Sequence, residues 1–381
     1  MLSSKYIMTR PIKCFYFDHA YDQAASGPCC YLSIDGATNF KDLHQHPKYI
    51  EIKQNFEQGK WTDSYCDKCK NLEQINDSTN ISKRQSGLHL YTTYQVTNND
   101  VDKLYQLTVD TGRYCNIQCR SCNPYSSSSW IPEWLYMSQH NITNLNKWEY
   151  SPIKNKKTWP TTYYDQSDDF SNVKTVSLLG GEPLYNQDTL VNILQKILDS
   201  AGPACLITIN TNATISYSAI KILKEFKRIV LILSIDAVGK AAEFIRTGCN
   251  WENVNTNILE YKKSLNIDLL YHPAYSILNL FEFVKLRDWF TDLNIPETSE
   301  TTVVTTPAYL NYSILNDTEK VKVLKYLKEN NLNFIYELIK NSVYNENDRK
   351  IFFNFMEHTK SYHQLDWREY LPELYALMGD S

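Results

Sequence analysis

Cys115-Asn-Ile-Gln-Cys119-Arg-Ser-Cys122 contains three cysteines in a CxxxCxxC spacing, directly after a strand-like run at residues 104–110. Three thiolates on a short loop can hold three irons of a cubane cluster, because soft sulfur ligands suit iron–sulfur centres. The motif has no fourth ligand, so one iron would stay open for a small molecule, as in reactive rather than closed structural metal sites. The spacing therefore favours an iron–sulfur loop with an open coordination position.

The same residues can also be interpreted as half of a zinc ribbon, with Cys66-Asp-Lys-Cys69 as the other half. Zinc ribbons usually pair two CxxC knuckles. The extra residue between Cys115 and Cys119 disfavours zinc. A zinc-stabilised, non-enzymatic binding module is the alternative that this pattern leaves open.

The composition indicates a globular chain. It has 381 residues, enough for one large domain with extensions or for two domains, and 43% of them are hydrophobic and 22% charged. The net charge of −4 supplies no overall basic field, so we do not expect a nucleic-acid partner. Residues 1–10 lack the apolar core of a signal peptide, and no apolar run has the length of a membrane span. We expect a cytoplasmic protein without a membrane partner.

Ten cysteines without a secretion signal indicate a reducing compartment and thiolate chemistry rather than disulfides. The N-terminal region offers a second four-thiolate set, the natural count for one closed cluster or one zinc ion. Its members are Cys14, Cys29 or Cys30, Cys66 and Cys69. Adjacent cysteines on a strand point to opposite faces, so only one of Cys29 and Cys30 should be a ligand, and we prefer Cys29. Cys205 and Cys249 stand alone and are interpreted as small buried hydrophobic residues.

From about residue 104, apolar β-branched runs alternate with helical patterns. Strands are expected at residues 104–110, 173–179, 205–210, 229–235, 267–271 and 300–305. Helices are expected between them at residues 188–200, 216–226, 251–265 and 280–291. Near-continuous apolar strands separated by amphipathic helices predict a parallel sheet covered by helices. Six such repeats favour a partial (β/α)6 barrel at residues 101–306, with an open doubly wound sheet as the alternative.

The flanking regions have other patterns. Residues 1–100 are interpreted as an irregular cysteine-rich module, with a strand at 26–36 and a short amphipathic helix at 47–59. Residues 307–381 are interpreted as a helical C-terminal extension. Its helices are expected at 319–330, 333–343 and 348–358.

In barrels of this kind the chemistry lies at the C-terminal ends of the strands. Three further motifs follow expected strands: Gly180-Gly-Glu-Pro183, Thr211-Asn-Ala-Thr214 and Ser234-Ile-Asp236. Each is weak alone, because Gly and Asn are ordinary turn residues. Their order after CxxxCxxC is specific, and over residues 104–260 the sequence resembles the radical SAM (S-adenosylmethionine) superfamily, whose fold is an α/β partial barrel.

The resemblance implies that Cys115, Cys119 and Cys122 bind a [4Fe–4S] cluster, whose open iron chelates the amino and carboxylate groups of SAM. Gly180, Gly181 and Glu182 match the motif that holds the SAM amino group. Glycines let backbone carbonyls approach closely, and a carboxylate accepts hydrogen bonds from an ammonium group.

Further positions match the rest of SAM. Asn212 and Ser234 match polar positions near the ribose, and Arg246 matches an arginine that faces the SAM carboxylate, to which its planar donor fork is suited. Many family members carry an aromatic residue just before the third cysteine, where it packs near the adenine. This chain has Ser121 there, so the adenine contact would come from Tyr114 or Tyr125.

The N-terminal cysteines, with Ser82-Lys-Arg84 and Ser126-Ser-Ser-Ser-Trp130, make the chain similar to twitch-domain-containing radical SAM proteins, with the auxiliary-cluster module placed before the barrel. That similarity implies a second iron–sulfur cluster, expected to act as a redox relay. Its ligands would be Cys14, Cys29 or Cys30, Cys66 and Cys69.

The resemblance implies reductive cleavage of SAM to a 5′-deoxyadenosyl radical, which abstracts hydrogen from a peptide or small-metabolite substrate. An electron donor such as a flavodoxin or ferredoxin is the implied partner. The crossover at residues 122–172 is unusually long and contains an expected helix at 130–139. Its Tyr- and Asn-rich loop from Trp130 to Phe170 is the expected substrate determinant. His272 and His363 are candidate acid–base groups, although a lone histidine is more often structural. A nucleic-acid substrate is the further alternative, for which Lys154, Lys156 and Lys157 leave room.

Overall fold

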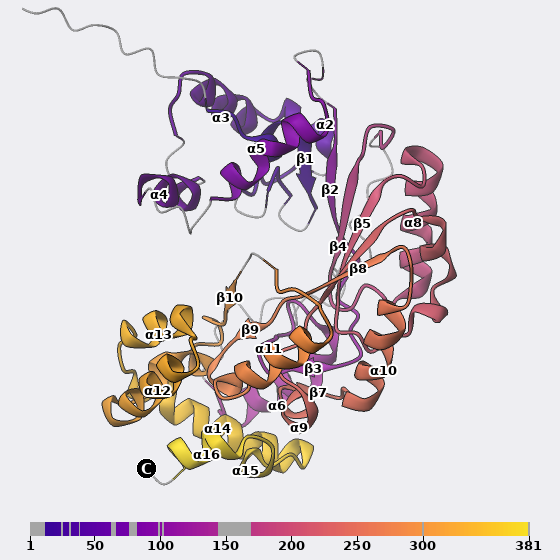
Figure 1. The fold of residues 1–381 in the computed structure, drawn as a ribbon. Coiled ribbons are helices and arrows are strands. Elements are labelled where there is room, and N and C mark those ends of the chain that lie inside the picture. Colours follow the sequence, from indigo (N-terminus) through magenta and orange to yellow (C-terminus); the bar gives the residue numbers. More distant parts are fainter. Residues whose placement is uncertain are drawn as a thin grey trace, which may run out of the picture.

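A six-stranded parallel sheet forms the centre of the molecule (Figure 1). The computed structural model describes residues 12–23, 26–29, 32–37, 39–61, 66–75, 82–97, 100, 103–143, 169–298 and 301–379. The strands, in spatial order, are β1 (Ala20–Asp22), β2 (Gln106–Asp110), β4 (Thr175–Leu179), β5 (Leu206–Thr211), β6 (Ile229–Leu233) and β8 (Ile267–Tyr271). The spatial order follows the chain order without the reversal that defines doubly wound sheets, so that alternative is wrong.

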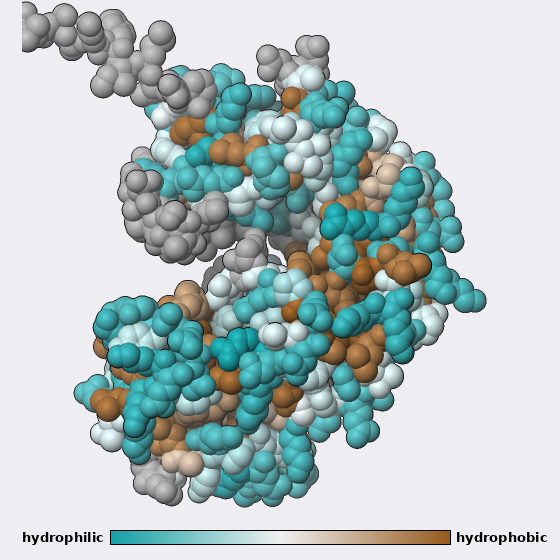
Figure 2. Space-filling model, in the orientation of Figure 1, coloured by the Kyte–Doolittle hydropathy of each residue, from teal (hydrophilic) through white to brown (hydrophobic). Residues whose placement is uncertain are grey.

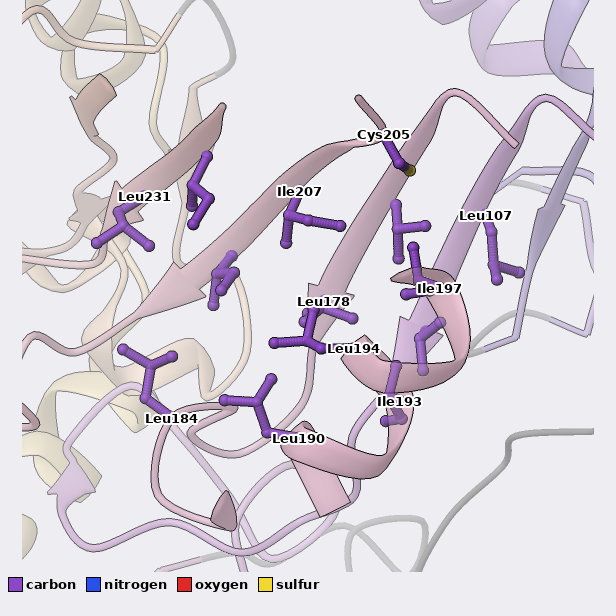
Figure 3. Packing of buried hydrophobic residues seen from close by; sticks show 14 of the residues in the cluster. Leu107, Leu178, Leu184, Leu190, Ile193, Leu194, Ile197, Cys205, Ile207 and Leu231 are labelled. Atoms are coloured by element: carbon purple, nitrogen blue, oxygen red, sulfur yellow. The ribbon is translucent and has the colours of Figure 1, made fainter. Parts of the chain in front are cut away.

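Each strand separates an apolar face from a more polar one. In β2, Leu107 and Val109 are buried, whereas Gln106 and Thr108 on the other face are half-buried. Helix α8 (Gln187–Ala201) packs Leu190 and Leu194 against the apolar face (Figure 3). Helices α10 (Trp251–Lys262) and α11 (Phe283–Asp292) contribute to the same core. The helices therefore cover one face of the sheet and leave the other for a site.

Five of the six expected strands are confirmed, and the sixth is wrong as a member of this sheet. The segment expected at 300–305 contributes β10 (Thr302–Val303), which pairs with β9 (Ala274–Tyr275) in a separate two-stranded sheet. After α11 the chain contacts β8 through an isolated bridge between Tyr271 and Glu297. The sixth strand is instead β1, from the N-terminal region, which pairs parallel with β2.

The expected helix at 216–226 is also wrong. Its place is taken by two 3₁₀ segments, η3 (Tyr217–Ala219) and η4 (Lys221–Glu225). The side-chain amide of Asn266 donates to the carbonyl oxygens of Leu223 and Phe226, at 3.1 and 3.0 Å. Those carbonyls are the ones a continuing α-helix would use, so the segment stays short.

The N-terminal region is more helical than expected. The helix expected at 47–59 is confirmed as α3, but the strand expected at 26–36 is wrong: the described residues there form two isolated bridges, Asp22 to Gly27 and Cys29 to Leu32. A β-carbon on Gly27 would lie 1.8 Å from the Leu32 oxygen, so the chain turns back on itself too tightly for a strand. The helices are α1 (Phe15–His19), α2 (Phe40–Gln45), α3 (Pro47–Glu57), α4 (Asp67–Ile75) and α5 (Lys83–Thr93).

The C-terminal extension is helical, as expected. Its helices are α12 (Asp317–Glu329), α13 (Asn333–Lys340), α14 (Glu346–His363), α15 (Trp367–Tyr370) and α16 (Pro372–Met378). They share a second core with α6 (Ile131–Gln139) and α9 (Gly239–Ile245). The surface is hollowed between the N-terminal helices and this C-terminal layer (Figure 2). Within the described ranges, the helices fall short of the length and apolar character that crossing a membrane requires.

Replacing Arg349 by Ala should destabilise the C-terminal layer. Its guanidinium forms two hydrogen bonds to the Glu319 carboxylate, at 2.7 and 2.8 Å, and both side chains are buried. The variant leaves a buried carboxylate without its counter-ion, which costs about 3–5 kcal/mol. The matched control is Lys350→Ala, which removes an exposed pair with Glu346 and should cost less than about 1 kcal/mol. Urea unfolding followed by circular dichroism compares the two; equal midpoints would contradict the assignment.

Candidate functional site

The cysteine loop leaves the C-terminal end of β2 and is fixed by backbone and side-chain contacts. Cys119 lies in β3 (Gln118–Cys119), which pairs antiparallel with β7 (Arg246–Thr247). The Trp130 indole donates to the Cys119 carbonyl at 3.0 Å, and the Ser129 hydroxyl donates to the Ile117 carbonyl at 2.8 Å. The serine-rich segment before Trp130 therefore holds the loop in place, a role that the sequence did not reveal.

Cys115, Cys119 and Cys122 line one cavity of about 200 Å³ together with the glycine corner at residues 180–182, Asn212, Ser234 and Arg246. The sequence-predicted site residues thus come together at the C-terminal ends of the strands. Burial raises the pKa of all three thiols, that of Cys122 to about 12, and neighbouring cysteines add to the effect at Cys119 and Cys122. Within the described ranges, however, no three His, Cys, Asp or Glu side chains converge closely enough to form a metal-binding group as they stand.

The donors around the thiols fit a sulfur-ligated group. Arg246 Nη1 lies 3.4 Å from Cys119 Sγ, and Asn212 Nδ2 lies 3.9 Å from Cys115 Sγ. Hydrogen bonds of this kind to cluster sulfurs stabilise the charge of thiolate ligands. The cavity, the three sulfurs and the nitrogen donors are therefore compatible with an iron–sulfur cluster and one small ligand.

The glycine corner packs against the chain that leads into the cysteine loop. The amide of Gly181 donates to the Gly112 carbonyl and that of Glu182 to the Tyr114 carbonyl, both at 2.8 Å. A β-carbon on Gly181 would lie 2.4 Å from the Tyr114 oxygen, and Gly180 has a φ of +141°, which disfavours any other residue. The two glycines closely approach the backbone of residues 112–114. A close approach of the same glycines to SAM stays a prediction.

The Glu182 carboxylate is buried and ties β4 to β5. It accepts hydrogen bonds from the backbone amide of Leu184 at 3.1 Å, the hydroxyl of Thr211 at 2.8 Å and the backbone amide of Asn212 at 2.6 Å. Burial raises its pKa to about 7, although these hydrogen bonds and the charge of Arg246 act in the opposite direction. Glu182 therefore positions Asn212 and retains limited capacity to accept from a ligand.

Arg246 is held between a carboxylate and a cysteine. Its Nε lies 2.9 Å from Asp236 Oδ2, and Asp236 in turn accepts from the Ala274 amide at 2.8 Å. The sequence predicted a role for Arg246. It predicted none for Asp236, although Asp236 ends the motif that begins at Ser234. The ion pair links the segment after β6 to β7 and presents the guanidinium to Cys119, while the hydrogen bond from Ala274 ties Asp236 to the segment after β8.

A buried charged group joins the cysteine loop to the C-terminal extension. Glu133 of α6 contacts Arg120 at 3.3 Å, His358 at 3.0 Å and His363 at 2.8 Å. Burial would raise the pKa of Glu133, but the hydrogen bonds from both histidines and the Arg120 charge outweigh it and lower the pKa to about 2. His363 thus pairs with Glu133 in a structural contact, whereas the sequence had suggested it as an acid–base group.

The N-terminal cysteines lie within electrostatic range of one another. Burial raises the pKa of Cys14, with further contributions from Cys29 and Cys66, and raises that of Cys66 to about 12, with contributions from Cys29 and Cys69. Arg84 braces the group through two hydrogen bonds to Glu73 of α4, at 2.8 and 2.5 Å. Cys30 lies outside the described residues, as do Lys154, Lys156 and Lys157.

A second cavity, of about 520 Å³, adjoins the first. Leu179 and Asn210 line both cavities, and the far end of the larger one is lined by Cys29 and Lys83 from the N-terminal region. His272 also lines it, with Nδ1 2.5 Å from the Thr298 hydroxyl and Nε2 2.8 Å from that of Thr302. The larger cavity therefore extends from the smaller cavity to one of the N-terminal cysteines.

The remaining sequence assignments fall outside both cavities. Tyr114 and Tyr125 are about half exposed, and neither lines the smaller cavity; an adenine contact from either stays a prediction. Cys205 is buried, as expected, whereas Cys249 is only half-buried; a structural role for each stays a prediction. Most of the polar loop between α6 and β4 lies outside the described residues.

Replacing Gly181 by Ala should displace the cysteine loop. The added methyl group would collide with the Tyr114 carbonyl, a backbone atom that can move only with the loop, at a cost of about 1–3 kcal/mol. We expect less iron bound per chain after anaerobic reconstitution. Gly202→Ala is the control, since Gly202 has a positive φ but nothing within 4 Å of an added β-carbon. Equal iron content in the two variants would contradict the packing role.

Comparison with known proteins adds a match in the middle of the chain. Residues 111–238 match the family described as a 4Fe-4S single cluster domain. No curated protein matches the chain. Two solved structures illustrate the structural similarity. Native anSMEcpe with bound AdoMet and Cp18Cys peptide has 15% identity, a TM-score of 0.35, and coverage of 63% of this chain and 62% of that one. Histidine-tagged anSMEcpe with bound AdoMet has 16% identity, a TM-score of 0.38, and coverage of 63% of each chain.

The chain therefore spans less than two thirds of the length of these structures. The family match covers the three cysteines of the loop, the glycine corner, Asn212 and Ser234, and it ends before Arg246. The central part of the chain is thus similar to a 4Fe-4S single cluster domain, and this segment is the one that the structure gathers around the smaller cavity.

Proposed function

We propose that the chain is a radical SAM enzyme, in which Cys115, Cys119 and Cys122 bind a [4Fe–4S] cluster. The observation that carries the proposal is the gathering of three cysteines, a glycine corner and polar strand ends around one cavity, with no fourth cysteine in its described lining. The match of this segment to a 4Fe-4S single cluster domain supports it. When bound, the cluster supplies the electron that cleaves SAM to methionine and a 5′-deoxyadenosyl radical, which abstracts hydrogen from the substrate.

The chain's own residues would bind and orient SAM. Backbone carbonyls of Gly180 and Gly181 and the Glu182 carboxylate would accept from its amino group, and Arg246 would face its carboxylate. Asn212, held by Glu182, and Ser234 would contact the ribose. Burial of the cavity wall would exclude water and strengthen each of these interactions.

The larger cavity is the proposed substrate chamber, because it shares Leu179 and Asn210 with the smaller cavity. A peptide or a small metabolite are the substrate classes that we retain. His272 lines this chamber between two threonine hydroxyls and is the acid–base candidate that remains there.

Residues 1–100 would form a twitch-like auxiliary module that also lends β1 to the central sheet, ahead of the barrel at 101–306 and the helical extension at 307–381. Cys14, Cys29, Cys66 and Cys69 would bind a second iron–sulfur cluster, and their mutual electrostatic interactions support the grouping. Cys29 also lines the larger cavity, so a cluster there would lie close enough to a substrate to act as a redox relay. A flavodoxin or ferredoxin would supply electrons, and we propose a cytoplasmic location.

Anaerobic reconstitution with iron and sulfide should yield a brown protein with about eight irons per chain, if both clusters are cubanes. Reduction in the presence of SAM should release 5′-deoxyadenosine, measured by liquid chromatography. Replacing Cys115, Cys119 and Cys122 together by Ala should abolish that release. The control is the double variant Cys205→Ala and Cys249→Ala, which keeps both proposed ligand sets. SAM cleavage by the triple variant would refute the site.

Replacing Cys66 and Cys69 by Ala should remove one cluster and leave the other. We expect the loss of about four irons per chain while SAM cleavage continues, because the two ligand sets are separate in the chain. Metal analysis by mass spectrometry measures iron and zinc together. Unchanged iron would exclude these two cysteines as cluster ligands, and loss of zinc instead of iron would favour the zinc alternative for this region.

A further inference from the structure

The floor of the larger cavity is polar where the inner face of a parallel sheet is usually apolar. Such faces are normally filled by Val, Ile and Leu side chains. Here Thr108 of β2, Ser177 of β4 and Thr208 of β5 line the cavity, and Gln106 and Asn210 lie beside them. Each of these side chains can donate and accept hydrogen bonds.

The strand register arranges these groups in a row. Thr108 is paired with Asp22 on one side and with Ser177 on the other, and Ser177 is paired with Thr208. Register partners project on the same side of a sheet, and all four line the cavity. A carboxylate and three hydroxyls therefore cross four adjacent strands, which lie about 4.8 Å apart.

One polar atom of the cavity floor lacks a hydrogen-bond partner among the described residues. Gln106 Oε1 is buried and has no hydrogen-bond partner among the described residues. A buried acceptor without a partner costs about 1–3 kcal/mol, and such atoms in native proteins are normally satisfied by a ligand or a water molecule. A ligand in the cavity that donates a hydrogen bond to this oxygen would remove that cost.

The charges around the cavity disfavour several ligand classes. Lys83 is the one cationic side chain among its described lining, and Asp22 and Glu297 oppose it. Phosphates and other anions are bound by arginine clusters or helix N-termini; among the described lining there is no arginine, and at the N-terminus of α5 the charge of Lys83 is opposed by the two carboxylates. A peptide that binds by strand addition needs a free sheet edge, whereas the cavity lies over the face of the sheet.

We propose that this cavity binds a neutral, multiply hydroxylated small molecule of the saccharide class. Its hydroxyls would pair with the row of Asp22, Thr108, Ser177 and Thr208, one of them donating to Gln106. The ring of Tyr16, which also lines the cavity, would contact its apolar face. That this ligand is the substrate rests on the proposed function, since Leu179 and Asn210 join the two cavities.

The test measures binding of mono- and disaccharides, with glucose, galactose, N-acetylglucosamine and maltose as probes. Saturation-transfer NMR is recorded on the reconstituted full-length chain without SAM, so the result is independent of SAM cleavage. The variant Thr108→Val, Ser177→Ala and Thr208→Val removes three hydroxyls at nearly constant volume and adds no polar group, so it should fold. We expect its affinity for a bound saccharide to fall at least about tenfold.

Thr256→Val is the matched control, because Thr256 bonds within the exposed face of α10 and should leave binding unchanged. Binding of a saccharide that is lost in the triple variant supports the proposal. Three outcomes overturn it: no probe binds, the triple variant binds as well as the parent chain, or a tetrapeptide library binds at the cavity while the saccharides do not. Failure of SAM cleavage alone would overturn the proposed function and leave the saccharide site standing.

Discussion

The cysteine loop depends on a contact between two backbone segments that leaves no room for a side chain. Gly181 and Glu182 donate from their amides to Gly112 and Tyr114, each at 2.8 Å. Because residues 112–114 lead directly into Cys115, the end of β4 determines where the loop begins. A side chain at position 181 would collide with backbone rather than with a flexible group, so the neighbouring chain cannot yield without moving the loop.

An arginine–glutamate ion pair lies beside each of the two cysteine groups. Arg84 and Glu73 brace the N-terminal group, and Arg120 and Glu133 brace the loop at 115–122. The pair of Arg120 and Glu133 is fully buried. A buried ion pair adds little net stability, yet breaking it is costly, so its main effect is to fix one arrangement of the loop. Through His358 the second pair also fixes α14, which makes the C-terminal extension part of the support of the loop.

The sequence predicted the features that depend on local pattern. Strand periodicity identified five of the sheet strands, and cysteine spacing together with motif order identified the residues that line the smaller cavity. It missed β1, because a three-residue strand has no periodicity to detect. It also missed the partners of Glu133, because His358 lies 225 residues further along the chain and only the packing of α14 on α6 brings the two together. Long-range contacts of this kind leave no local signal.

The polar floor of the larger cavity contributes little hydrophobic stabilisation, so other parts of the sheet must supply it. Hydroxyl side chains such as Ser177 and Thr208 bury little apolar surface, so the stability of these strands has to come from their other face. There Leu178 and Ile207 pack against α8 (Figure 3). Alternation along a strand lets one face drive folding while the other is free to hydrogen-bond a ligand. A floor of hydroxyls also attracts water rather than a collapsing apolar side chain, and this keeps the cavity open between the two groups of cysteines.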